Sequence, residues 1–361
     1  MKIIDVKLKM NSYSIVVGNG ILKDIGRYVK ALKCGTDAII ITNPGINKLY
    51  GSVIAKSLKA QGLSSKVVEV ADGEKSKQFK VAFDVIQQIA QYDVFKKPFV
   101  VALGGGVVGD LAGFVASIYK RGIPYIQIPT TLLAQIDSAI GGKTAIDLPV
   151  GKNLVGAFYQ PRMVFSDVAL LRSLDQRQIL NGFAEAVKYG VICDVALFTF
   201  LEKNYQKLLS GDLKVLELVV AECSKIKAAV VAIDEKETIG LRTILNFGHT
   251  IGHAIEAANK FGYYQHGEAV ALGMRCAAEI SVIKKLCSPK DAVRLNALLD
   301  DMGLPKKIGK TKLSDILSLM KRDKKFISGK NRFVLMRKIG IVDVIEGVPE
   351  EVIKEVIGKN I

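Results

Sequence analysis

All three histidines of this 361-residue chain, His249, His253 and His266, lie in one short window. His249 and His253 are four residues apart, so on a helix they share one face, as in zinc-binding helices. The sequence proposes these imidazoles as metal ligands, against the alternative that they are ordinary core or surface histidines. Because no CxxC pair occurs, the remaining ligand should be a carboxylate, as in catalytic zinc sites with an open position. The candidates are Glu185, Glu256 and Glu268.

A glycine-rich turn could hold a dinucleotide. Gly104, Gly106 and Gly109 satisfy the pattern GxGxxG between an apolar run and a helical one, where backbone N–H groups can meet a pyrophosphate. The acidic residue expected about 20 positions later is missing, so a turn needed only for packing is the alternative. Two more polar loops, Asp72–Lys77 and Pro129–Thr131, follow other expected strands. Together the three loops favour a nucleotide crevice.

Several basic side chains stand in glycine-rich or apolar surroundings. Lys143 lies in IGGKT, Lys152 and Asn153 lie in GKNL, and Arg242 precedes Asn246 by four residues. Taken singly, each could be a solvated surface group. Taken together, they favour an anionic substrate, since phosphate and carboxylate groups require charge-assisted hydrogen-bond donors.

The elements that must position these groups change character along the chain. Apolar runs predict strands at 38–42, 66–70, 99–103 and 125–128, and helical spacing predicts helices at 49–63 and 78–92. This alternation predicts a mostly parallel, Rossmann-like sheet with helices on both faces. Later periodicity is helical over 178–191, 195–209, 213–232, 248–259, 267–286 and 290–302, with one strand-like run at 332–339. We therefore expect an α/β domain at 1–178, which contains the three candidate nucleotide loops, and an all-α domain at 179–361, which contains the candidate metal ligands.

Composition narrows the class of protein. A hydrophobic content of 49% excludes global disorder, and five widely spaced cysteines fit a reducing cytoplasm. The apolar segment 99–118 contains five glycines and an aspartate, which favours strand, turn and helix over a membrane span. The formal net charge of +16 could serve nucleic acid binding. The densest basic run, 321–325, is short and is interrupted by Asp323, so we expect no nucleic acid partner.

The chain resembles the 3-dehydroquinate synthases of the sugar phosphate cyclase superfamily in six ordered motifs: GGGVVGD, IPTTLLAQIDSAIGGKTAID, GKNLVGAFYQP, NGFAEAVKYG, LNFGHTIGHAIE and HGEAV. The resemblance implies conversion of 3-deoxy-D-arabino-heptulosonate 7-phosphate (DAHP) to 3-dehydroquinate and phosphate, in the shikimate pathway of chorismate and aromatic amino acid biosynthesis. It implies bound NAD and a divalent metal, zinc or cobalt. The implied steps are alcohol oxidation, phosphate elimination, carbonyl reduction, ring opening and aldol closure. A cytoplasmic homodimer with a small-molecule substrate and no membrane partner is also implied.

The same resemblance assigns residues. It makes Glu185, His249 and His266 the metal ligands and turns His253 into a substrate-contacting or proton-relay residue. The other catalytic positions are Lys143, Lys188, Lys227, Glu237, Arg242 and Asn246, and the substrate-binding positions are Arg121, Asp137, Lys152, Asn153 and Lys324 or Lys325. NAD is expected at Asn43, Asp72, Gly73, Glu74, Lys75, Ser76, Lys77, Gly105, Gly106, Val107, Val108, Gly109, Asp110, Thr130, Thr131, Lys143, Lys152, Leu170, Leu171, Arg172 and Ser173.

Two departures from the family pattern and three alternative functions complete the sequence reading. The segment Asp234–Gly240 is one residue longer than the form typical of the family. The extra residue affects how Lys227 and Glu237 are matched to the family positions. Leu-Leu-Arg-Ser at 170–173 replaces the more usual Phe-Leu-Lys-Thr near the adenosine side. The alternatives are another cyclase such as 2-deoxy-scyllo-inosose synthase, a metal-dependent polyol dehydrogenase, and a nucleic-acid-binding protein. Lys227, Arg242 and Asn246 favour a substrate that bears a carboxylate.

Overall fold

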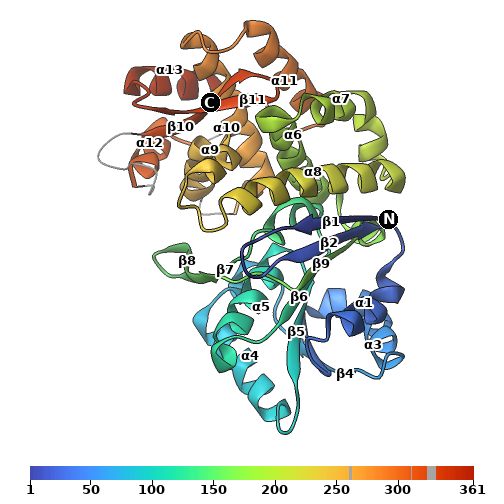
Figure 1. Cartoon of the computed structure of the whole chain (residues 1–361). Coiled ribbons are helices and arrows are strands. Elements are labelled where there is room, and N and C mark those ends of the chain that lie inside the picture. The colour runs from blue at the N-terminus through green and yellow to red at the C-terminus, as the bar shows by residue number, and fades with distance from the viewer. Residues whose placement is uncertain (260–261, 310, 323–330) are drawn as a thin grey trace. The chain divides into compact units, whose positions relative to one another are not determined.

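The computed structural model describes residues 1–259, 262–309, 311–322 and 331–361 (Figure 1). It forms two compact units, one made of Met1–Leu174 with Leu216–Lys236 and the other of Asp175–Val215 with Glu237–Ile361. The long helix α8 (Leu213–Ile233) therefore belongs mostly to the first unit. The sequence suggested one boundary near residue 178, because helical spacing shows that a segment is a helix but not which core receives it.

A seven-stranded sheet forms the centre of the first unit. In spatial order its strands are β1 (Lys2–Val6), β2 (Tyr13–Gly18), β9 (Met163–Asp167), β6 (Tyr125–Pro129), β5 (Pro98–Gly104), β3 (Asp37–Thr42) and β4 (Ser64–Glu69). Only the pair β1–β2 is antiparallel, and all other pairs are parallel. The mostly parallel sheet predicted from the apolar runs is thus confirmed. The missed strands are β1, β2 and β9.

Helices cover both faces of this sheet, as the buried strands require. Alternate residues of a strand point to opposite faces. Ile39 and Ile41 of β3 pack with helices α4 (Phe79–Tyr92) and α5 (Gly106–Ile118). Ile40 packs on the other face with the helices α1 (Ile25–Leu32) and α3 (Ser52–Lys59). The apolar runs lack polar alternation because both faces are buried.

The strand order reverses between β3 and β5. From β3 the chain proceeds to β4 on one side, then crosses to β5 and β6 on the other. In α/β sheets of this kind, ligands bind outside the carboxyl ends of the strands at such a switch point. Asn43 follows β3 and Gly105 follows β5, so both predicted NAD-binding positions lie at this edge. Short helical turns connect the remaining elements of the unit: η1 (Leu22–Asp24), α2 (Pro44–Ile46), η2 (Asn47–Gly51), η3 (Glu74–Ser76), η4 (Tyr119–Arg121), η5 (Ala134–Ser138) and η6 (Val168–Ser173).

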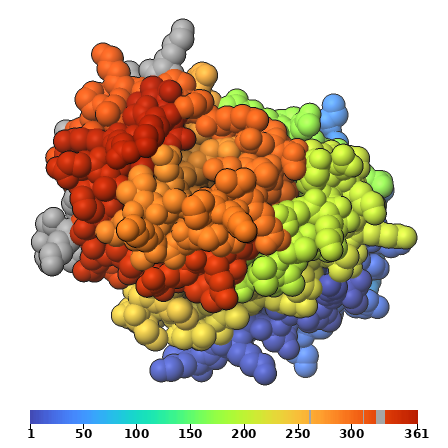
Figure 2. All heavy atoms as spheres, turned by 90° about the horizontal axis from the view of Figure 1, so that it is seen from above, coloured from blue at the N-terminus to red at the C-terminus, as the bar shows by residue number. Residues whose placement is uncertain are grey.

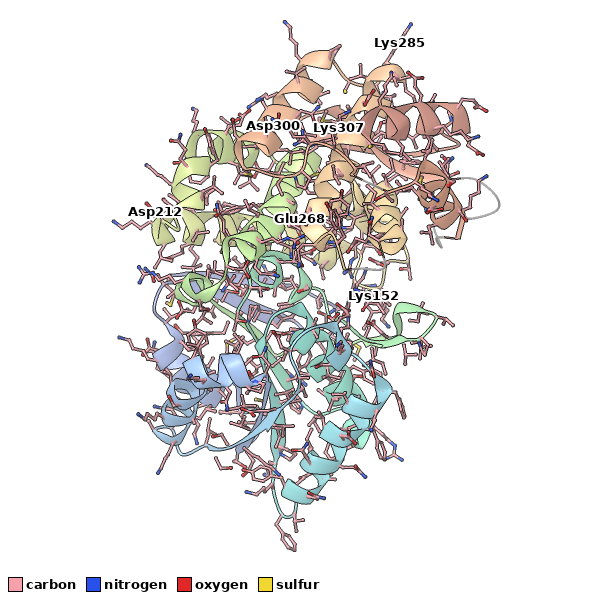
Figure 3. All side chains as sticks on the ribbon, turned by 180° about the vertical axis from the view of Figure 1, so that it is seen from behind. Lys152, Asp212, Glu268, Lys285, Asp300 and Lys307 are labelled. Carbon is pink, nitrogen blue, oxygen red and sulfur yellow. The ribbon has the colours of Figure 1, made fainter. Side chains whose placement is uncertain are left out.

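A separate antiparallel hairpin, β7 (Lys143–Leu148) and β8 (Gly151–Phe158), carries three of the predicted site residues. They are Lys143, Lys152 and Asn153. The sequence analysis did not identify this hairpin, because its glycines obscure the alternation typical of strands. Lys152 is visible at the hairpin in Figure 3.

The second unit is mainly helical, as expected. Its remaining elements are α6 (Gln176–Cys193), α7 (Val195–Leu209), η7 (Leu241–Asn246), α9 (His249–Ala258), α10 (His266–Ile283), α11 (Pro289–Asp301), α12 (Leu313–Arg322), α13 (Glu350–Asn360) and a hairpin of β10 (Arg332–Lys338) and β11 (Ile341–Glu346). The strand-like run at 332–339 is β10. The second unit is therefore not all-α as expected, because it also contains this hairpin. In Figure 2, the orange and red segments of this unit adjoin one another on the face that is shown.

The apolar segment 99–118 is strand β5, the glycine turn and helix α5, as predicted. Among the described residues, no helix combines the length and hydropathy that a bilayer crossing requires.

Asp37 at the start of β3 is a buried carboxylate held by several donors. Thr36 and Ser64 donate through their hydroxyls, and Lys96 Nζ lies 3.1 Å from Oδ1. Burial alone would raise the pKa of Asp37, but these hydrogen bonds hold it well below its ordinary value. The carboxylate therefore stabilises the first unit in its charged form.

Replacing Asp37 with asparagine is expected to lower the free energy of unfolding by about 3 kcal/mol at pH 7. Because the folded pKa is depressed, this stabilisation is complete above the unfolded pKa of about 4 and is lost as the pH falls. Urea unfolding at pH 7 and pH 3 should therefore show the gap between wild type and variant shrinking in acid. Asp84→Asn, at an exposed position on α4, is the matched control and should change little. An equal gap at both pH values would contradict the argument.

Candidate active site

Helices α6, α9 and α10 bring one carboxylate and two imidazoles together within the second unit. Oε1 of Glu185 lies 3.4 Å from Nε2 of His249 and 3.3 Å from Nε2 of His266. The ligand atoms of the three residues all lie within 4.8 Å of one another. Glu185 is fully buried, whereas the His266 side chain is 29% exposed. The cluster is therefore enclosed on the α6 side and open at His266.

His266 is fixed because it is the first residue of α10. The preceding Gln265 forms a reciprocal capping box with Glu268, and Arg177 binds both oxygens of Glu268 at 2.7 Å. The side chain of Asn181 on α6 accepts a hydrogen bond from the Gly267 N–H. A Cβ atom on Gly267 would lie 2.1 Å from the Asn181 carbonyl oxygen, so only glycine permits this approach of α10 to α6.

Glu268 therefore has a different role from the one considered for it. The sequence admitted Glu268 as a candidate ligand, but its carboxylate is occupied by Arg177 and by the Gln265 backbone N–H. Figure 3 shows Glu268 within the helical unit, whereas Lys285 points outward from it. The sequence Gln-His-Gly-Glu at 265–268 is the signal that could have identified this helix cap.

His249 begins α9 in the same way that His266 begins α10. Gly248 precedes it with φ of +79°, in the left-handed region that favours glycine. Nδ1 of His249 lies 3.1 Å from the carbonyl oxygen of Phe247. With the proton on Nδ1, Nε2 is left as the electron-pair donor on the Glu185 side.

Charges within the cluster are closely balanced. Lys188, one turn after Glu185 on α6, forms a buried ion pair with it. Burial would raise the pKa of Glu185, but Lys188 and His266 lower it to about 2. Burial would lower the pKa of His266, but Glu185 and Glu256 raise it to about 10. Without a cation, a proton on His266 supplies the charge that the two carboxylates attract.

This cluster fits a divalent metal ion. Both side-chain oxygens of Glu185 are buried beside Lys188 and His266. Neither oxygen has a hydrogen bond of regular geometry from the described residues. Two imidazole nitrogens and a carboxylate oxygen form a donor set that zinc and cobalt accept. A second group, His253, Glu256 and His266, also has ligand atoms within 4.8 Å of one another. The His253 ring lies 5.1 Å from the His249 ring by their centroids.

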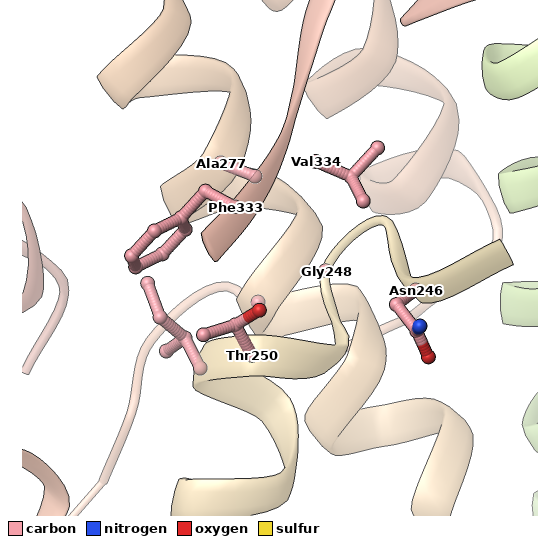
Figure 4. A pocket seen from close by; sticks show the side chains of 8 residues that line it. Asn246, Gly248, Thr250, Ala277, Phe333 and Val334 are labelled. Atoms are coloured by element: carbon pink, nitrogen blue, oxygen red, sulfur yellow. The ribbon is translucent and has the colours of Figure 1, made fainter. Parts of the chain in front are cut away.

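The segment before α9 places two more predicted residues. Arg242 is buried in η7, with Nε 3.4 Å from Oε1 of Glu237 in the preceding loop. Asn246 ends η7 and lines a narrow hollow between α9, α10 and β10, together with Gly248, Thr250 and Phe333 (Figure 4). The hollow has no room for a water molecule, so it is a packing gap and not a ligand pocket.

In the first unit, four consecutive strand ends carry the predicted NAD-binding loops. Asn43 after β3 donates to Asp72 after β4, at 3.0 Å. The Thr130 N–H after β6 donates to the carbonyl of Gly104 at the end of β5. Helix α5 begins after Gly105, beyond the carboxyl end of β5, and the N-cap residue provides no side-chain acceptor for the first N–H groups of the helix. These are the properties of a diphosphate-binding helix start.

Lys77 ties these loops together. Its buried Nζ donates to Asp110 of α5 at 2.8 Å, contacts Asn153 of β8, and lies 3.8 Å from Glu74. Burial lowers the pKa of Lys77, but Asp110, Glu74 and Asp147 raise it overall. Lys152 of β8 also pairs with Glu74, at 3.3 Å. The predicted residues of η3, α5 and the hairpin thus form one network.

Other predicted positions are more scattered. Lys227 of α8 donates to the carbonyl of Asp137 at 2.8 Å and contacts its carboxylate, so these two lie together within the first unit. Leu170 and Leu171 are buried in η6, where Arg172 and Ser173 also lie. Arg121, a predicted substrate-binding residue, lies in η4 directly after α5, at the end of that helix away from the glycine turn. Lys324 and Lys325 lie outside the described residues.

Comparison with known proteins shows to which family the chain belongs. The family model described as 3-dehydroquinate synthase N-terminal matches residues 67–181, and the model described as 3-dehydroquinate synthase C-terminal matches residues 182–326. A 3-dehydroquinate synthase of Desulforamulus reducens is 46% identical over 351 residues, which are 97% of this chain and 98% of that protein. The chain belongs to the 3-dehydroquinate synthase family. The resemblance drawn from the six motifs is confirmed.

Solved structures of related cyclases agree in fold. A 2-deoxy-scyllo-inosose synthase complexed with carbaglucose-6-phosphate, NAD⁺ and Co²⁺ matches with a TM-score of 0.91, at 28% identity over 100% of both chains. A 2-epi-5-epi-valiolone synthase from Streptomyces hygroscopicus subsp. jinggangensis 5008, with NAD⁺ and Zn²⁺ bound, matches with a TM-score of 0.88, at 25% identity over 98% of both chains. This chain therefore shares its fold with a 2-deoxy-scyllo-inosose synthase and a 2-epi-5-epi-valiolone synthase.

Proposed function

We propose that this chain converts DAHP to 3-dehydroquinate and phosphate, with NAD and a divalent metal, zinc or cobalt, as cofactors. The observation that carries the proposal is the 46% identity to a 3-dehydroquinate synthase over nearly the whole of both chains. The carboxylate–imidazole cluster and the strand-edge loops support it, because they suit a metal ion and a dinucleotide respectively. Bound NAD supplies a reversible hydride acceptor, and the bound metal supplies a Lewis acid that lowers the pKa of a substrate hydroxyl.

In the second unit, Glu185, His249 and His266 would hold the metal. Lys188 contacts Glu185 from within α6 and keeps that carboxylate charged in a fully buried position. His253 is proposed to move a proton at its ring nitrogens, since its ring lies beside the cluster without belonging to the Glu185 group. Arg242 and Asn246 would bind the substrate carboxylate, because a buried guanidinium and an amide are strong donors to such a group.

In the first unit, the glycine turn and the Asp72–Lys77 loop would bind NAD. The N–H groups at the start of α5 suit the diphosphate, and the salt bridge from Lys77 to Asp110 holds the two loops at one edge of the sheet. Lys143, Lys152 and Lys227 would bind anionic groups of the substrate. The family resemblance also supports a homodimer, which sedimentation velocity would test, and the widely spaced cysteines support a cytoplasmic location.

The second candidate is another sugar phosphate cyclase, favoured by the structural match to 2-deoxy-scyllo-inosose synthase. The two functions differ in substrate charge, since DAHP has a carboxylate and glucose 6-phosphate has none. Phosphate release measured with each substrate, in the presence of NAD⁺ and Zn²⁺ or Co²⁺, should occur with DAHP only. Release from glucose 6-phosphate only would replace the proposed function with the alternative.

A further inference from the structure

Both ring nitrogens of His266 face a carboxylate. Nε2 lies 3.3 Å from Glu185 on the proposed metal side, and Nδ1 lies 3.2 Å from Oε2 of Glu256. The Glu256 side chain is only 12% exposed. The sequence considered Glu256 only as a candidate metal ligand, and the family resemblance assigns it no role.

The contact between Glu256 and His266 selects one form of the imidazole ring. A carboxylate accepts hydrogen bonds but does not donate them, so a neutral His266 ring that binds a metal through Nε2 carries its proton on Nδ1 and donates it to Glu256. The electron pair of Nε2 then points toward Glu185 and His249, where a metal ion would be bound. His249 is oriented in the same way, but by the Phe247 carbonyl. Metal-binding histidines commonly donate their second N–H to a carboxylate or a carbonyl in this manner.

The packing of α9 against α10 holds Glu256 in place. Glu256 follows His249 by seven residues on α9, so the two side chains leave the same face of the helix. The two helices approach closely through glycines, since a Cβ atom on Gly273 would lie 1.9 Å from the Gly248 carbonyl oxygen. One face of α9 thus carries His249, a proposed ligand, and Glu256, which contacts the other proposed histidine ligand, His266.

We propose that Glu256 is a positioning residue that fixes the ring orientation and proton position of His266 so that Nε2 is ready to bind the metal. This inference rests on the proposed function, in which His266 is a ligand. It differs from a second metal site at His253, Glu256 and His266, where Glu256 would itself contact the ion.

Metal binding by the full chain tests the inference without any assay of activity. Metal-free wild type, Glu256→Gln and Glu256→Ala would each be titrated with Zn²⁺ against a competing chelator. We expect one zinc per chain in wild type and a dissociation constant 10- to 100-fold higher for the alanine variant. The glutamine variant should lose less affinity, because its amide oxygen still accepts from Nδ1. Glu279→Gln, on the same helix as His266 and paired with Asn360, is the control and should bind as wild type.

Nitrogen-15 NMR of the three histidine rings supplies a second measurement. In zinc-loaded wild type, His266 should show a proton on Nδ1 with the downfield shift of a strong hydrogen bond. That shift should decrease in Glu256→Gln and be absent in Glu256→Ala, while the His249 signal stays unchanged. Circular dichroism would establish that each variant is folded. If the alanine variant does not fold, the isosteric variant Glu256→Gln alone tests the inference.

Three results would overturn the inference. Wild-type affinity and wild-type His266 signals in both Glu256 variants would show that the carboxylate does not position the ring. Two zinc ions per wild-type chain, with one lost in Glu256→Gln, would make Glu256 a ligand. If wild type itself bound no zinc, the metal assignment of the proposed function would fail first, which distinguishes that failure from failure at Glu256 alone.

Discussion

Replacing His249 with alanine is expected to abolish stoichiometric zinc binding and to lower turnover of DAHP by roughly 10³-fold or more, because a Lewis acid contributes several kcal/mol to such chemistry. Binding of NAD⁺ should persist, since the predicted NAD loops belong to the other compact unit. Zinc content by atomic absorption, NAD⁺ affinity by calorimetry and phosphate release from DAHP measure these three effects.

His253→Ala is the matched control for this substitution. His253 lies one turn after His249 on α9 but is not part of the group that contains Glu185. Its variant should keep one zinc per chain while turning over more slowly, by about 10²- to 10⁴-fold for loss of a proton-transfer group. Stoichiometric zinc and full activity in His249→Ala would show that the metal assignment is wrong.

Replacing Gly106 with valine is expected to weaken NAD⁺ binding by about 100-fold, equivalent to about 3 kcal/mol. A Cβ atom at this position would lie 2.8 Å from Oγ of Ser138, and the two added methyl groups would crowd the start of α5. The backbone N–H groups there are the proposed diphosphate contacts. Calorimetric titration with NAD⁺ measures the effect.

Zinc binding by Gly106→Val is its internal control. The variant should bind one zinc per chain with wild-type affinity, which is the converse of the result expected for His249→Ala. Gly358→Ala, where a Cβ atom meets nothing within 4 Å, shows the effect of a glycine substitution away from the turn. Unchanged NAD⁺ affinity in Gly106→Val would mean that the glycine turn serves packing only.

The sequence predicted the helices with regular apolar spacing and three of the buried strands, but it missed the buried strands β2 and β9. β3, β5 and β6 were recognised because uninterrupted apolar runs are required under helices on both sides. β7 and β8 were missed, because glycines and exposed side chains remove any clear period. The assignment of Leu216–Lys236 to the first unit also could not be predicted, since a helix buried on several faces gives no sign of its partner.

At the candidate site, sequence spacing alone favoured three histidine ligands. His253 shares a helix face with His249, but Glu185 comes from α6, far away in the chain, and only the folded helices bring it to 3.4 Å. The sequence offered Glu185 as one of three candidate carboxylates, and the resemblance to a family selected it. Neither the spacing nor the resemblance pointed to Asn181 and Arg177, which fix the start of α10 through Gly267 and Glu268.

The excess of basic residues is only partly explained by the site. Lys77, Lys188 and Lys227 are buried and paired with carboxylates, so they serve local structure as well as any ligand. Others, such as Lys285, point outward. Basic side chains of the second kind keep a protein soluble without indicating a partner.

The most direct measurement of the central claim is the stoichiometry of the reaction with NAD⁺ well below the substrate concentration. Purified protein with Zn²⁺ or Co²⁺, a trace of NAD⁺ and excess DAHP should release phosphate and form 3-dehydroquinate in equal amounts over many turnovers per NAD⁺. Absorbance at 340 nm should not rise, since the cofactor is regenerated in each cycle. Accumulation of NADH without phosphate release, or no 3-dehydroquinate from DAHP, would contradict the proposed function.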